Sequence, residues 1–74
     1  MQPNYLGKYV VVNSSGAVEL RSTAGGGPIA TFGHDAQLAM MSGDVIQVNL
    51  KNGKVIFYKL SSTGYAVSGP YITL

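Results

Sequence analysis

The sequence predicts an all-β fold, and three observations lead to this expectation. Short β-branched and aromatic runs recur along the chain, as in residues 8–12 and 45–50. Gly, Asn, Ser and Pro separate these runs at short intervals, as expected for turns. No segment has both the length and the apolar spacing of an ordinary helix. We therefore expect several short strands and no helix.

Length and composition favour one small, weakly charged domain. Residues 1–74 are expected to form a single unit, and a chain this short buries only about 60–65% of its unfolded surface. There is no cysteine, so neither a disulfide nor a thiolate metal site is available. Charged residues make up 11% of the chain against a usual value of about 25%, whereas 46% of residues are apolar. Such a surface favours association and argues against disorder.

The first half of the chain predicts three strands. Residues 8–12 form the first strand, and residues 13–16, Asn-Ser-Ser-Gly, form a turn. Residues 17–22 alternate between apolar and charged side chains, which predicts a strand with one buried face. Residues 23–28 contain three consecutive glycines and read as a flexible loop. A short strand is expected at residues 29–32, followed by a turn at 33–36.

The second half predicts four further strands and a closing segment. Residues 37–41 have a composition that suits a helix, but the segment is too short to be stable alone, so we expect a strand. Two strands follow around Asn52-Gly53, and a short strand is expected at residues 64–67. Residues 70–72 close the domain.

Asn52-Gly53 predicts a two-residue type I′ turn, since both central residues of that turn need positive φ. Lys51 would then pair with Lys54, and Leu50 with Val55. This register gathers four apolar side chains on the second face of the hairpin. Either a strongly curved barrel buries both faces, or this second face meets another chain. In the second case the oligomer interface would contain Val45, Ile56, Tyr58 and Leu60.

Several segments together resemble a bacterial SH3 domain. They are Tyr9-Val10-Val11-Val12, Val18-Glu19-Leu20-Arg21-Ser22, Ser42-Gly43-Asp44-Val45-Ile46-Gln47-Val48, Asn52-Gly53, Thr63-Gly64-Tyr65-Ala66-Val67-Ser68 and Tyr71-Ile72. The resemblance implies a small five-stranded SH3-like barrel with a non-catalytic binding or assembly role. Lys54 stands where this family often has Trp, and the loop at residues 23–36 is long for the family.

Aromatic side chains are the best candidates for binding a partner, because they offer a large contact area, and tyrosine adds a polar tip. By the resemblance, a groove for an extended protein or peptide would be lined by Tyr9, Phe32 and Tyr71. His34, a further candidate, lies in the long loop at residues 23–36, near Phe32. We expect this loop to be mobile in the free protein, with Phe32 as its apolar anchor on a partner.

Catalytic and cofactor motifs are missing from the sequence. The single histidine has no nucleophile in a typical setting, and Gly25-Gly26-Gly27 lacks the Gly-Lys-Ser/Thr of a phosphate-binding loop. One His and three acidic residues are too few for a zinc site within one chain. We therefore expect no enzyme activity, no cofactor and no metal.

These observations leave three functional hypotheses. The first is a protein-interaction or self-assembly module, and the second is a structural protein made to oligomerise, such as a virion component. The third is a small nucleic-acid-binding β-barrel, against which the five scattered basic residues argue. The sequence has neither a signal-peptide pattern nor an apolar run of about 20 residues, which argues against a membrane partner and favours a cytoplasmic or virion-associated protein.

Overall fold

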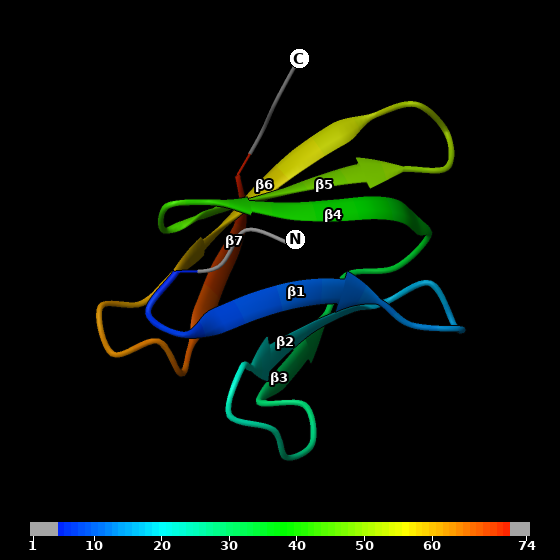
Figure 1. Cartoon of the computed structure of the whole chain (residues 1–74). Coiled ribbons are helices and arrows are strands. Elements are labelled where there is room, and N and C mark those ends of the chain that lie inside the picture. The colour runs from blue at the N-terminus through cyan, green and yellow to red at the C-terminus, as the bar shows by residue number, and fades with distance from the viewer. Residues whose placement is uncertain (1–4, 72–74) are drawn as a thin grey trace.

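The chain is all-β over the residues that the computed structural model describes, residues 5–71, which confirms the predicted fold class. Figure 1 shows the strands arranged as two layers with the connecting turns at their ends. The strands are β1 (Lys8–Val12), β2 (Val18–Ser22), β3 (Ala30–Phe32), β4 (Ala36–Ser42), β5 (Val45–Leu50), β6 (Val55–Leu60) and β7 (Val67–Tyr71).

Two antiparallel sheets form from consecutive strands. One has the order β1-β2-β3, and the other has the order β4-β5-β6-β7. β1 of the smaller sheet lies next to β4 of the larger one (Figure 1). Within each sheet, every strand therefore pairs with its neighbour in sequence, which keeps the connections short.

The structure has seven strands within residues 5–71, whereas the resemblance to bacterial SH3 domains implied five. The additional two, β3 and β4, lie in the stretch between the second and third matching segments. Both were expected as strands from their own residues. Within the same range the strand pairings form two separate sheets and not one closed barrel.

Apolar side chains of both sheets meet in one core. In β1 and β2 every second residue points inward, which buries Val10, Val18 and Leu20 completely. Fully burying one such side chain contributes about 1.5–3 kcal/mol. The larger sheet completes the core with Ala36, Ala39, Met41, Ile46, Val48, Tyr58 and Leu60.

The hairpin between β5 and β6 differs from the predicted one by a single residue. Asn49 pairs with Val55 and Ile46 with Tyr58, so the predicted pairing of Leu50 with Val55 is wrong. The Gly53 N–H donates to the Leu50 carbonyl at 3.0 Å, and Gly53 alone has positive φ, at 90°. These features match a three-residue loop, a type I turn followed by a glycine bulge.

This shift reverses the faces of β6. A slip of one residue moves every side chain of a strand to the opposite side of the sheet. Tyr58 and Leu60 consequently lie in the core, at 6% and 4% exposure, and Phe57 lies on the outer face. The three-residue loop also spares Asn52 the positive φ that a type I′ turn would impose on it.

The last strand begins later than predicted. Gly64 and Tyr65 lie in a turn rather than in a strand, and β7 starts at Val67. Ser61 stabilises the turn, because its Oγ accepts a hydrogen bond from the Ala66 N–H at 3.2 Å. Of the predicted closing segment, residues 70 and 71 belong to β7 and residue 72 lies outside the described range.

A two-residue turn with two positive φ angles does occur, but at Leu6-Gly7. Leu6 has φ 55° and Gly7 has φ 70°, and the flanking Tyr5 and Lys8 exchange two backbone hydrogen bonds of 2.9 Å. This is the geometry of a type I′ turn. Leucine is a poor residue for it, because its Cβ crowds the backbone in the left-handed region.

Replacing Leu6 by asparagine is therefore expected to stabilise the protein. Leu6→Asn should raise the free energy of unfolding by about 1 kcal/mol, since Asn tolerates positive φ and Leu6 is half exposed. Urea denaturation would measure this change. Leu6→Val is the control and should be destabilising, because a β-branched side chain suits this conformation least. Equal stabilities of the two variants would contradict the assigned turn.

Candidate binding surface

The outer face of the larger sheet carries an apolar surface that no part of the described chain covers. The side chains that point away from the core follow from the register: Met40 lies opposite Gln47, Gln47 opposite Phe57, and Phe57 opposite Tyr71. We call this surface the outer face. Its members are Leu38, Met40, Val45, Gln47, Asn49, Val55, Phe57, Lys59 and Tyr71.

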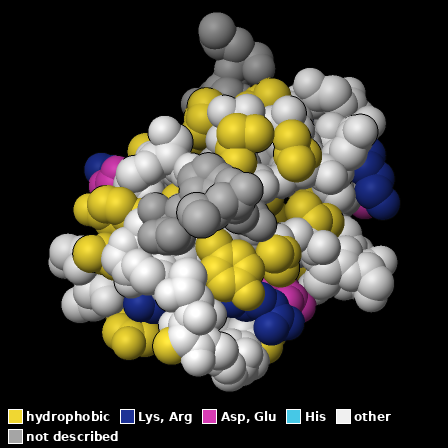
Figure 2. Space-filling model, in the orientation of Figure 1, with side chains coloured by type: hydrophobic (Ala, Val, Ile, Leu, Met, Phe, Trp, Pro, Cys, Tyr) yellow, Lys and Arg dark blue, Asp and Glu magenta, His cyan; other side chains and the backbone are white. Residues whose placement is uncertain are grey.

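The outer face is unusually apolar for an exposed surface. Leu38, Met40 and Tyr71 are 46%, 37% and 49% exposed, and they belong to the few large apolar side chains that lie open to solvent. The two amides in the middle satisfy each other in part, because Gln47 Nε2 donates to Asn49 Oδ1 at 2.9 Å. Figure 2 shows hydrophobic side chains scattered among polar ones over this side of the molecule, in its upper, central and lower parts.

Charged side chains lie at the two ends of the outer face. Lys59 Nζ is 3.9 Å from Asp44 Oδ2 at one end. The β5–β6 hairpin carries Lys51 and Lys54 at the other end. The interior of the face has no charge, so it can be covered by an apolar partner without burying an unpaired ion.

Only one residue of the predicted oligomer interface lies on this surface. Val45 belongs to the outer face, but Tyr58 and Leu60 are buried and Ile56 packs against the core. The four residues therefore do not share a face, because the hairpin register differs from the predicted one. The predicted interface is therefore wrong as a set, and the apolar residues that face outward are different ones apart from Val45.

Phe32 lies in β3 and not in a long loop. It pairs with Val18, and its ring centroid is 4.5 Å from that of Tyr58 across the two sheets. Burial raises the pKa of the Tyr58 hydroxyl above its usual value. Phe32 is therefore a core-margin residue in this structure, and the glycine loop that precedes it is confined to the residues between β2 and β3.

The other predicted binding residues are dispersed. His34 is 88% exposed, and its Nδ1 lies 3.4 Å from Asp35 Oδ2. Tyr9 lies opposite Arg21 on the smaller sheet, whereas the Tyr71 hydroxyl contacts Ser68 Oγ at 3.1 Å on the larger one. Tyr9, Phe32, His34 and Tyr71 thus have separate partners on different parts of the two sheets, and the structure does not bring them together as one groove.

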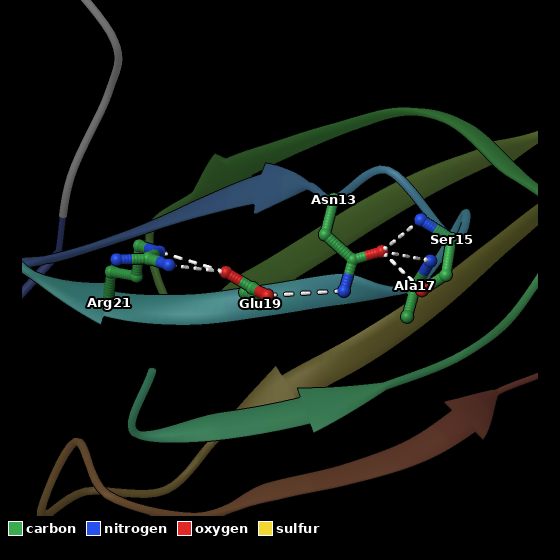
Figure 3. Close-up of polar contacts among 5 residues, drawn as sticks. All are labelled: Asn13, Ser15, Ala17, Glu19 and Arg21. Atoms are coloured by element: carbon green, nitrogen blue, oxygen red, sulfur yellow. Dashed lines mark hydrogen bonds and ion pairs between the residues drawn. The ribbon is translucent and has the colours of Figure 1, made fainter. Parts of the chain in front are cut away.

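A polar network on the smaller sheet has a structural role (Figure 3). The Asn13 side-chain oxygen accepts hydrogen bonds from the N–H groups of Ser15 and Ala17, at 2.9 and 3.0 Å, which fixes the β1–β2 turn. Asn13 Nδ2 donates to Glu19 Oε2 at 3.1 Å, and Arg21 Nη2 lies 2.8 Å from Glu19 Oε1. The hydrogen bonds from Asn13 and Arg21 lower the pKa of Glu19 below its usual value, so the carboxylate stays ionised.

A buried lysine joins the two sheets at one end of the core. Lys8 is 8% exposed, its Nζ donates to the Leu6 carbonyl at 3.1 Å, and the ammonium lies 4.7 Å from the centre of the Tyr65 ring. Such cation–π contacts are worth about 0.5–2 kcal/mol. Lys8 therefore ties the start of β1 to the turn that precedes β7.

The comparisons with known proteins give no relative. No protein-family model, no curated protein and no solved structure matches the chain. Within residues 5–71 no group of three or more His, Asp or Glu side chains could hold a metal ion. The same part of the chain contains no helix that is long and apolar enough to cross a membrane. The feature of the molecule that points to a function is therefore the apolar outer face.

Proposed function

We propose that this chain is a non-catalytic self-assembly module of SH3-like ancestry, and that a second copy of the chain covers its outer face. The observation that carries the proposal is a partly exposed sheet surface without charge in its interior, on which Met40, Gln47, Phe57 and Tyr71 form one row across the strands. Large contiguous apolar patches are rare on the surface of monomeric proteins, and where they occur they commonly mark interaction sites.

The order of the strands supports the SH3-like part of the proposal. The quoted segments of the resemblance contain most of β1, all of β2, the first part of β5 and both ends of β7. The two additional strands, β3 and β4, lie where that family has a variable loop. The Asn-Gly turn also lies where the family has its hairpin, between β5 and β6.

A second copy is the partner that the charges of the outer face fit. The net charge of the chain is +2, so two copies repel each other only weakly. The centre of the face is neutral, and one end carries both signs, on Asp44 and Lys59. A strongly charged partner such as a nucleic acid would find no complementary patch there.

The size of the face predicts a weak interface. Four strands about 4.8 Å apart and about six residues long, at about 3.3 Å per residue, define a flat area of roughly 400 Å². A standard interface hides about 800 Å² on each partner. The larger sheet alone therefore supports reversible, concentration-dependent association rather than a permanent dimer.

A charge placed in the middle of the outer face is expected to abolish this association. Wild-type protein should exceed its monomer mass of 7.8 kDa as its concentration rises, whereas native Phe57→Lys monomer, which has not been unfolded and refolded at high concentration, should stay monomeric. The reason is that a buried, unpaired ammonium costs several kcal/mol. Sedimentation equilibrium over a hundred-fold concentration range would measure both masses.

Ser14→Lys is the matched control for this experiment. It adds the same charge at an exposed position of the β1–β2 turn, in the other sheet, and should associate like the wild type. Both variants should keep the wild-type melting temperature within about 2 °C, since neither site lies in the core. A wild-type protein that stays monomeric at millimolar concentration, or equal loss of association in both variants, would contradict the proposal.

A further inference from the structure

Each of the two sheets is built from one uninterrupted stretch of chain. The smaller sheet uses strands β1 to β3, and the larger sheet uses strands β4 to β7. The chain passes from one sheet to the other once, through Gly33, His34 and Asp35 (Figure 1). This arrangement divides the protein into two halves that share a single connection.

The two halves contact each other mostly through side chains, apart from the backbone hydrogen bond from the Ala36 N–H to the Gly16 carbonyl. No strand of one sheet pairs with a strand of the other within residues 5–71. The Phe32 ring contacts the Tyr58 ring, and the Lys8 ammonium contacts the Tyr65 ring. A separate chain with the same sequence could supply either side of these contacts, because none of them depends on the covalent connection.

The connection between the halves is short and strained. Asp35 has φ 54°, a conformation that L residues other than glycine seldom adopt, and Gly33 before it has φ 76°. The side chains of His34 and Asp35 are 88% and 77% exposed, so no packing holds them. The end of the connection is fixed by two backbone bonds, from Ala36 N–H to the Gly16 carbonyl and from Lys51 N–H to the Asp35 carbonyl, both 2.9 Å.

We propose that residues 33–35 are a hinge through which two copies of the chain exchange their β1–β3 sheets. In the exchanged dimer the smaller sheet of each copy packs on the larger sheet of the other. Every core contact between the sheets is kept, and only the hinge changes its conformation. A strained, short connection between two such halves is the condition under which exchange occurs at low cost.

This mode of association is independent of the outer face. Exchange uses the surface between the two sheets, whereas the outer face remains open in the exchanged dimer. The two modes also differ in rate, because exchange requires the two halves to separate and face-to-face contact does not. Phe57→Lys, which is designed to prevent contact through the outer face, should therefore leave exchange intact.

Mixed-label refolding tests the exchange directly. Phe57→Lys protein labelled with carbon-13 and the same unlabelled variant are unfolded together, refolded at millimolar concentration and separated by gel filtration. The dimer fraction is then examined by isotope-filtered nuclear Overhauser spectroscopy. Exchange predicts an intermolecular signal between the rings of Phe32 and Tyr58, which lie 4.5 Å apart. A dimer in which this signal is only intramolecular would overturn the proposal.

Two hinge variants adjust the proportion of dimer in opposite directions. Deleting His34 shortens the hinge, so that the halves of one chain no longer reach each other, and the product should run at twice the monomer mass. Asp35→Gly removes the strain at positive φ and should lower the dimer fraction of refolded protein at least two-fold. Folded monomer from the His34 deletion together with an unchanged dimer fraction for Asp35→Gly would also overturn the proposal. The absence of any dimer from the unmodified hinge would have the same consequence.

Discussion

Replacing Phe32 by alanine is expected to lower the free energy of unfolding by about 3 kcal/mol. Phe32 lies in the edge strand β3, where it pairs with Val18 of β2. Its ring packs on that of Tyr58 in the opposite sheet. Removing a phenyl ring from a packed core costs about 3–5 kcal/mol, and Phe32 is only partly buried, so the lower end applies. Domains of this size have about 5 kcal/mol in total. Urea denaturation followed by tyrosine fluorescence would measure the loss.

Thr31→Ala is the control for this variant. Thr31 lies in the same strand but is exposed, so its replacement should change the stability by less than about 0.5 kcal/mol. Phe32→Leu should fall between the two, because leucine restores part of the apolar volume. A wild-type midpoint for Phe32→Ala would show that the ring does not belong to the core. It would also favour the expectation from the sequence that Phe32 is the apolar anchor of a mobile loop.

Gly69→Ala is expected to cost about 2–3 kcal/mol. Gly69 has φ 132°, and a methyl group there would lie 3.1 Å from the Phe57 carbonyl oxygen and 3.0 Å from Tyr58 Cδ2. Overpacking of this kind costs about 1–3 kcal/mol, and the unfavourable φ adds about 1 kcal/mol. The strand β7 would have to move away from β6. Thermal unfolding followed by circular dichroism would detect the change.

Gly26→Ala separates the two causes. Gly26 also has positive φ, at 93°, but no atom lies within 4 Å of the methyl position. This variant should therefore show only the conformational part, about 1 kcal/mol. Equal losses in Gly26→Ala and Gly69→Ala would mean that β7 does not pack closely on β6.

The strands were predictable because their residues carry a strong local pattern. In β1 and β2 apolar side chains alternate with polar or half-buried ones, and the structure buries Val10, Val18 and Leu20 as the period of two requires. The segment around Met40 and Met41 was also correctly assigned as a strand, although its composition suits a helix. Pairing with β5 decides that conformation, and pairing is not a local property.

The register of the β5–β6 hairpin could not be read from the turn residues. Asn52-Gly53 suits a two-residue turn, but it suits equally a three-residue loop with glycine last. Packing against the rest of the protein decides between the two loops, because the observed register buries Tyr58 beside Ile46 and exposes Lys59. The predicted register would have directed Lys59 to the face of Ile46. The requirement that Lys59 face solvent would have indicated the observed register.

The turn at Leu6-Gly7 could not be predicted from its own residues. Leucine disfavours positive φ, so no sequence rule would place a type I′ turn there. The hydrogen bonds between Tyr5 and Lys8 and the burial of Lys8 under Tyr65 hold the turn in place. Of the outer face, only Val45 and Tyr71 were among the predicted site residues, because its membership depends on the register of three hairpins at once.

Nuclear magnetic resonance on dilution shows whether a second copy covers the outer face. Amide and side-chain signals of uniformly labelled wild-type protein are recorded from millimolar to micromolar concentration. The account predicts shifts confined to the outer face, with Met40, Gln47 and Phe57 changing most, and no shifts at Ser14 or Thr63 on exposed turns. Signals that stay constant throughout the range, or that move mainly on the β1–β3 sheet, would contradict it.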